Sequence, residues 1–154
     1  MISEELSEEI DRLSSSIKSV HKINQSKAKI IIDHVFSEYI KDRSKIWWWE
    51  SLKREFILID YKDELGWDYI SNLVDRNEMA YFIVTDDEPE PWPVYKGSVK
   101  DIIFLLREMW RFEYIVVSEN ISWIIFDTHH NNLILSGSLA QCGRLDQTEC
   151  GPIR

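Results

Sequence analysis

The residues of this 154-residue sequence best able to do chemistry stand together at Asp127, His129 and His130. A carboxylate and two imidazoles can bind a metal ion or transfer protons. Adjacent histidines in an extended chain point to opposite sides, however, and a zinc site needs three or four ligands. Two interpretations follow: a small metal- or ligand-binding site, or a polar turn in which a histidine donates to a backbone carbonyl. We favour the turn and therefore expect no metal and no catalytic residue.

Other catalytic signatures are missing from the sequence. Cys142 and Cys150 have no histidine near them in the chain, so a thiol nucleophile is not expected, and as the only two cysteines they are expected to be free and reduced. The sequence contains no G-x-S-x-G, no P-loop and no G-x-G-x-x-G. These observations favour a non-catalytic protein without a cofactor.

Acidic residues are concentrated in one part of the chain. The net charge is −9, from 27 acidic and 18 basic residues. The segment 60–90 holds ten acidic and only two basic residues, whereas the rest is close to neutral. Such a charge distribution repels nucleic acid and anionic membranes and favours a basic protein partner. No run of about 18 apolar residues is present, and the acidic N-terminus does not resemble a signal peptide, so we expect a cytoplasmic protein.

Two stretches could bind that partner. A proline-stiffened acidic loop ends in a tryptophan that could anchor a partner, and it supplies five candidate binding residues: Asp86, Asp87, Glu88, Glu90 and Trp92. Trp47 is the sixth candidate, because three successive tryptophans at 47–49 cannot all face one core. The alternatives are a solvated loop with Trp92 tucked onto the core, and a helix whose spare aromatic at Trp47 has no role.

The segment 112–137 organises the predicted fold. It contains three apolar, β-branched stretches, at 112–117, 122–127 and 133–135, separated by polar turns. Local turns favour an antiparallel meander, and apolar residues on both faces indicate interior strands. Asn131 in the second turn can adopt a left-handed conformation.

The remaining elements complete an α+β prediction. Helices are expected at 3–20, 27–41 (capped by Ser26), 65–74 and 99–110 (capped by Ser98), and strands at 56–59, 79–84 and, as a brief edge strand, 94–95. We predict a mostly antiparallel, five- or six-stranded sheet packed with helices, with an N-terminal helical pair. The predicted domain covers residues 1–137, and 138–154 form a loose C-terminal tail.

The chain resembles the small, acidic bacterial immunity proteins encoded beside polymorphic toxins. It is loosely similar to the SUKH superfamily and to uncharacterised bacterial families with tryptophans and histidines in this position. The resemblance covers residues 47–137 and rests on the succession Tyr114-Ile115-Val116-Val117, Trp123-Ile124-Ile125, His129-His130, Leu133 and Gly137. It implies a non-catalytic protein that binds and neutralises a toxin, often a nuclease.

The sequence therefore supports a first hypothesis and an alternative. The first is an immunity or inhibitor protein that neutralises a basic partner, such as a nuclease toxin, through an acidic, aromatic surface. The alternative is a small metal- or ligand-binding enzyme with its site near Asp127, His129 and His130. A third hypothesis, self-association through the amphipathic N-terminal helix, is also open, and the sequence leaves the oligomeric state undetermined.

Overall fold

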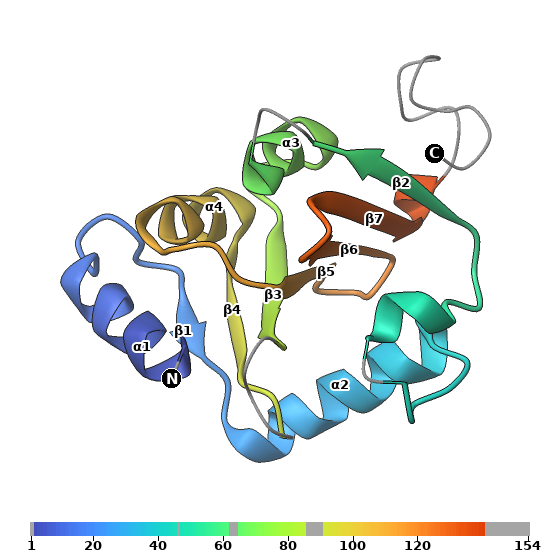
Figure 1. The fold of residues 1–154 in the computed structure, drawn as a ribbon. Helices are drawn as coiled ribbons and strands as arrows, with labels where there is room; N and C mark the ends of the chain where they lie inside the picture. Colours follow the sequence, from blue (N-terminus) through green and yellow to red (C-terminus); the bar gives the residue numbers. More distant parts are fainter. Residues whose placement is uncertain (1, 46, 62–64, 86–90, 141–154) are drawn as a thin grey trace.

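The computed structural model describes residues 2–45, 47–61, 65–85 and 91–140. These residues form a seven-stranded, wholly antiparallel sheet with helices on both faces (Figure 1). The helices are α1 (Ile2–Arg12), α2 (Gln25–Tyr39), α3 (Gly66–Leu73) and α4 (Val99–Glu108), with short 3-10 helices η1 (Trp48–Ser51) and η2 (Ser138–Ala140). The strands are β1 (His21–Lys22), β2 (Phe56–Asp60), β3 (Met79–Val84), β4 (Val94–Ser98), β5 (Tyr114–Ser118), β6 (Trp123–Thr128) and β7 (Asn132–Gly137). The predicted α+β class is confirmed.

The strands lie in the order β1-β4-β3-β5-β6-β7-β2. The predicted meander is present, because β5, β6 and β7 are neighbours joined by short turns. Their residues are almost all buried, as expected for interior strands. Asn131 has φ 60° in the turn between β6 and β7, as its residue type predicted.

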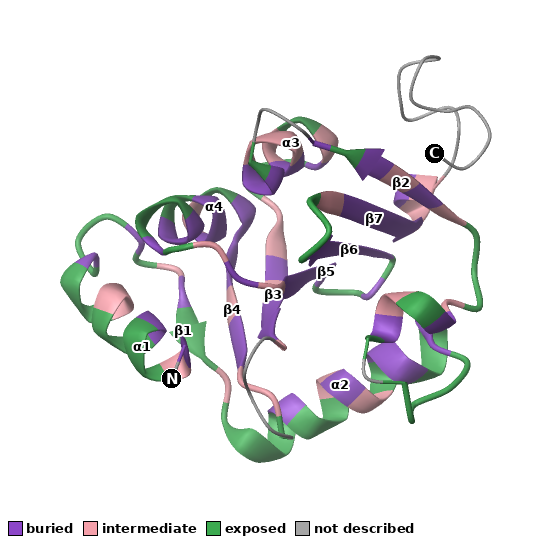
Figure 2. Ribbon diagram, viewed as in Figure 1, coloured by how far each residue is buried: buried purple, intermediate pink, exposed green. Residues whose placement is uncertain are grey.

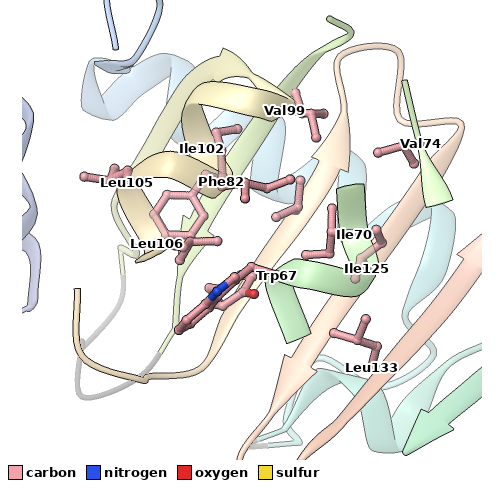
Figure 3. Close-up of a cluster of buried hydrophobic side chains, with 14 of the residues drawn as sticks. Trp67, Ile70, Val74, Phe82, Val99, Ile102, Leu105, Leu106, Ile125 and Leu133 are labelled. Carbon is pink, nitrogen blue, oxygen red and sulfur yellow. The ribbon is translucent and has the colours of Figure 1, made fainter. Parts of the chain in front are cut away.

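The two faces of the sheet carry separate hydrophobic cores, which Figure 2 shows as buried segments between the layers. Helices α1, α3 and α4 cover one face, where Trp67 of α3 and Leu106 of α4 pack over Phe82 and Ile125 (Figure 3). Helix α2 and the η1 segment cover the other face. Successive strand residues alternate between the two cores, so that Val116 joins the first and Val117 the second.

Several details of the predicted elements are wrong. The sheet has seven strands because the two-residue β1, too short to show any periodicity, pairs with β4. Consequently β4 is an interior strand between β1 and β3 and not an edge strand. The first helix ends at Arg12, since the serines at 14–16 have low helix propensity and allow only one further turn.

Helix α2 begins before the predicted cap. Asn24, not Ser26, is the N-cap, and its side chain accepts a hydrogen bond from the Lys27 amide at 3.0 Å. At α4, by contrast, Ser98 caps as predicted. Residues 138–140, which we assigned to the tail, form η2, and Leu139 is fully buried.

Within the described ranges, no helix is both long and apolar enough to cross a membrane.

Candidate functional site

Polar and aromatic side chains gather at one corner of the sheet, where the chain enters β5 and leaves β6. These strands are antiparallel and place Tyr114 opposite Asp127. The residues just before β5 therefore lie beside the turn after β6. Two groups of side chains meet here: a buried polar cluster beneath α3 and an exposed aromatic surface beside η1.

The buried polar cluster consists of Tyr61, Arg111, Tyr114 and Asp127. The Tyr61 hydroxyl donates a hydrogen bond to Asp127 Oδ1. Arg111 Nη2 donates to the Tyr61 hydroxyl at 2.6 Å and to the carbonyl oxygen of Thr128 at 2.7 Å, and it lies 3.7 Å from Asp127 Oδ1. Asp127 is only 3% exposed. A buried carboxylate is tolerated here because both a hydroxyl and a guanidinium compensate it.

Burial dominates the protonation of this cluster. It raises the pKa of Asp127, although the Tyr61 hydroxyl and the Arg111 charge oppose that rise. It also raises the pKa of Tyr61, and the neighbouring carboxylate raises it further. The Tyr114 hydroxyl is buried without a well-formed hydrogen bond to any described residue, yet Asp127 is near enough to add to the burial-induced rise in its pKa. Burial thus holds the pKa values of Tyr61, Tyr114 and Asp127 all above their ordinary values.

The second oxygen of Asp127 lies against the first residue of α3. A Cβ added to Gly66 would stand 2.3 Å from Asp127 Oδ2, which leaves room for no side chain. Leu65, the N-cap residue of α3, supplies no side-chain cap. A carboxylate at this end of a helix is stabilised by the helix dipole. The cluster therefore connects α3, the end of β2, β6 and the residues just before β5. Its role is structural.

The exposed aromatic surface, here called the aromatic patch, consists of Trp47, Trp49, His129 and His130. The two indoles stack with ring centroids 5.8 Å apart and an angle of 17° between planes. The His129 ring lies 5.0 Å from Trp47, and the His130 ring lies edge-on to Trp49 at 5.6 Å. Trp47 remains 40% exposed, so the patch presents an open ring to solvent.

Contacts on both sides hold the patch in place. Glu113 Oε2 accepts a hydrogen bond from the His129 amide at 2.8 Å and lies 2.7 Å from His129 Nδ1. Trp48, between the two patch tryptophans, is 3% exposed and packs on Phe36 with centroids 4.1 Å apart. Trp48 thus anchors the segment in the core and Trp49 is partly buried against the same core, whereas Trp47 points away from it, as the sequence predicted.

The structure separates Asp127 from His129 and His130, the three residues that the sequence grouped as a candidate chemical site. Asp127 faces the core beneath α3, whereas His129 bonds to Glu113 and His130 contacts Trp49. The two histidines occupy a turn, as the favoured interpretation expected, and their ring centroids are 4.0 Å apart. The Nδ1 atom of His129 faces the Glu113 carboxylate and not a backbone carbonyl. No group of three or more potential metal ligands occurs among the residues that the structure describes.

The predicted partner-binding residues have different outcomes. Asp86, Asp87, Glu88 and Glu90 lie outside the described residues, as do Cys142 and Cys150. Trp92 is half-buried, edge-on to Trp48 with centroids 4.4 Å apart, so it packs on the second core. Among the predicted residues, the structure thus brings Trp47 together with the histidines but not with Trp92.

Trp92 also borders a surface cavity of about 570 Å³ beside the start of α2. Its two basic side chains, Lys29 and Arg43, both pair with Asp33, at 2.8 and 2.9 Å. The cations in this cavity are therefore already neutralised in part, and the aromatic patch is the stronger candidate for binding.

Several members of these groups were not predicted from the sequence. The membership of Trp49 in the aromatic patch was not predicted: its side chain is partly buried against the second core, and its ring also contacts Trp47 and both histidines. Tyr61, Arg111 and Glu113 are far from their partners in the chain, and only the pairing of β2 with β7 and β5 with β6 brings them together. The turn after β6 was a usable signal, because any polar residues just before β5 must lie beside it in a meander.

A family model covers residues 2–147 of the chain, described as a family of unknown function (DUF6756). The protein belongs to this family. No curated protein and no solved structure matches it.

Proposed function

We propose that this protein is a non-catalytic binding protein of the immunity type. It acts in the cytoplasm and neutralises a basic protein partner, such as a nuclease toxin. The aromatic patch supplies the anchoring contacts. The acidic stretch at 86–90 supplies the long-range attraction.

The exposure of Trp47 carries this proposal. Tryptophan normally buries most of its surface. Trp110 is more exposed, at 51%, but lies apart from the aromatic patch with its indole N–H bonded to Glu5. Trp47 is nonetheless fixed, because Trp49 and His129 contact its ring. A preorganised tryptophan loses little entropy on binding, and tryptophan is enriched at the energetic centres of protein interfaces.

The charge of the chain favours a basic partner. Its net charge of −9 attracts cationic surfaces and speeds their encounter with the protein. A lysine or arginine brought to the patch can place its cation over an indole face. The substrate groove of a nuclease is electropositive, so an acidic protein with an aromatic anchor is suited to occlude it.

The test uses the protein encoded beside this chain's gene. If that neighbour is a basic nuclease, adding this protein should inhibit its activity at one-to-one stoichiometry. Charge reversal of Asp86, Asp87 and Glu88 should slow association and reduce its dependence on salt, because rim charges act chiefly on the rate of association. A neighbour that neither binds nor loses activity would refute the proposal.

The enzymatic alternative gains no support from the geometry. Asp127 is buried and bonded to Tyr61, whereas His129 and His130 lie together in the exposed turn and contact the aromatic patch. Metal analysis of the purified protein provides the direct comparison. Stoichiometric metal that is lost on replacing His129 or His130 would move the assignment to this alternative.

A further inference from the structure

Among the described residues, one edge of the sheet lacks the protection that the other edge has. At one end, β1 has only two residues and carries Lys22. Short length and lysine both discourage the pairing of an edge strand with another chain. At the other end, β2 has five residues, Phe-Ile-Leu-Ile-Asp, and within the described part of the chain it pairs only with β7. Its first four residues contain no charge and no proline, so β2 is an apolar edge strand.

Backbone hydrogen bonding shows which groups of β2 point away from β7. The Tyr61 amide donates to the carbonyl of Asn131 at 3.2 Å, in register with the β2–β7 ladder. Bonded and non-bonded pairs alternate along an antiparallel ladder. Ile57 and Ile59 are therefore bonded to β7, whereas the amides and carbonyls of Phe56, Leu58 and Asp60 point outward.

The side chains of these outward residues share one face. Phe56 and Leu58 are half-buried against the core beneath α2, and Asp60 is exposed. Each strand added at this edge would thus meet two apolar side chains followed by a carboxylate. Arg54, two residues before β2, has a 42% exposed side chain, and among the described residues its guanidinium meets Glu38 at 3.9 Å and the Tyr39 ring.

We propose that β2 pairs antiparallel with the β2 strand of a second copy of this chain, forming a two-fold dimer with a continuous sheet. The register is the one that sets the outward backbone amides and carbonyls of one β2 strand against those of the other. Phe56 lies opposite the partner's Leu58, so that apolar side chains meet, and both members of the pair can exchange their hydrogen bonds. The same register brings Arg54, at the bend just before β2, near the partner's Asp60.

Charge complementarity selects a second copy as the occupant. A two-fold axis repeats the Arg54–Asp60 pairing at both ends of the new ladder. The alternative symmetric register, with Leu58 opposite the partner's Leu58, would set Asp60 against the partner's Phe56 and lose both ion pairs. This surface uses the edge of β2 rather than the rings of the aromatic patch, so the proposal is independent of the proposed function.

Amide hydrogen exchange on the wild-type chain tests the pairing directly. The amides of Phe56, Leu58 and Asp60 should become protected as protein concentration rises, together with a doubling of the mass measured by light scattering. The Ile57 and Ile59 amides, bonded within the chain, should be protected at every concentration. Protection of Leu58 that does not depend on concentration, or a monomeric mass throughout, would overturn the proposal.

Charge-reversal variants test the register. Arg54→Glu and Asp60→Lys should each weaken dimerisation about tenfold or more at low salt, because each creates two like-charge pairs. Lys53→Glu makes the same charge change at an adjacent exposed position and should leave the dimer intact. An equimolar mixture of the two weakened variants should recover wild-type affinity as a heterodimer, since both cross-chain pairs are again opposite in sign. Circular dichroism checks folding, and failure of the mixture to recover affinity would refute the register.

Discussion

The hydroxyl of Tyr61 is the link that makes a buried carboxylate tolerable, and its removal should be costly. It donates to Asp127 Oδ1 and accepts from Arg111 Nη2 at 2.6 Å. Tyr61→Phe leaves the carboxylate buried without this donor, while Arg111 keeps its bond to the Thr128 carbonyl. A hydrogen bond to a charged group contributes about 1.5–3 kcal/mol. Asp127 and Arg111 each lose one such bond, and the side chains around them relax in part. We therefore expect the free energy of unfolding to fall by about 3 kcal/mol.

The pH dependence of this loss has a definite sign. Burial raises the folded-state pKa of Asp127, and the Tyr61 hydrogen bond lowers it. Tyr61→Phe should therefore raise that pKa further. A raised folded-state pKa gives stability that is present below the unfolded-state pKa and is lost as pH rises through the folded-state value. The variant should accordingly lose more stability at pH 7 than at pH 4, by about 1.4 kcal/mol for each unit of added pKa shift.

Urea unfolding at a series of pH values measures both quantities. Tyr69→Phe is the matched control, because the Tyr69 ring lies 6.4 Å from Tyr61 and its hydroxyl bonds to no described residue; it should cost less than about 0.5 kcal/mol. In an Asp127→Asn background, the effect of Tyr61→Phe should no longer depend on pH between 4 and 7. A loss below about 0.5 kcal/mol for Tyr61→Phe, or a larger loss at pH 4 than at pH 7, would refute this reasoning.

Two further predictions concern local features of the fold. Gly66→Ala should destabilise the protein by about 1–3 kcal/mol, because its Cβ would stand 2.3 Å from the fixed Asp127 Oδ2; a thermal melt showing an unchanged or higher midpoint would contradict this, since alanine normally stabilises a helix. Asn24→Ala should cost about 1 kcal/mol by removing the α2 cap, whereas Ser26→Ala should be nearly neutral. Equal losses of unfolding free energy for Asn24→Ala and Ser26→Ala, measured by chemical denaturation, would show that Asn24 is not the sole cap of α2.

Short-range signals in the sequence predicted much of the fold. Strand β3 was predicted with both its bounds correct, because Met79–Val84 is an unbroken apolar run between polar segments. The Ser98 cap and the β5–β6–β7 meander also follow from local residue types. Strand β1 could not be predicted, since two polar residues become a strand only because β4 offers an edge to pair with.

The candidate site was predicted only in part. The sequence predicted that Trp47 points away from the core, because three successive indoles cannot all pack on one side. The partnership of Trp47 with His129 does not, because it depends on how η1 docks against a turn about 80 residues later. Likewise Asp127 was recognised as chemically distinctive, but its partner Tyr61 is brought to it by the position of β2 at the far edge of the sheet.

The most direct test of the proposed function is the affinity for the neighbouring gene's protein, measured by calorimetry for wild type, Trp47→Ala and Phe104→Ala. Trp47 and Phe104 are similarly exposed, at 40% and 42%, but Phe104 lies on α4 outside the aromatic patch. We predict that Trp47→Ala weakens binding by at least about 2 kcal/mol, roughly thirtyfold, while Phe104→Ala leaves it unchanged. Equal affinities for wild type and Trp47→Ala would contradict a binding role for the patch.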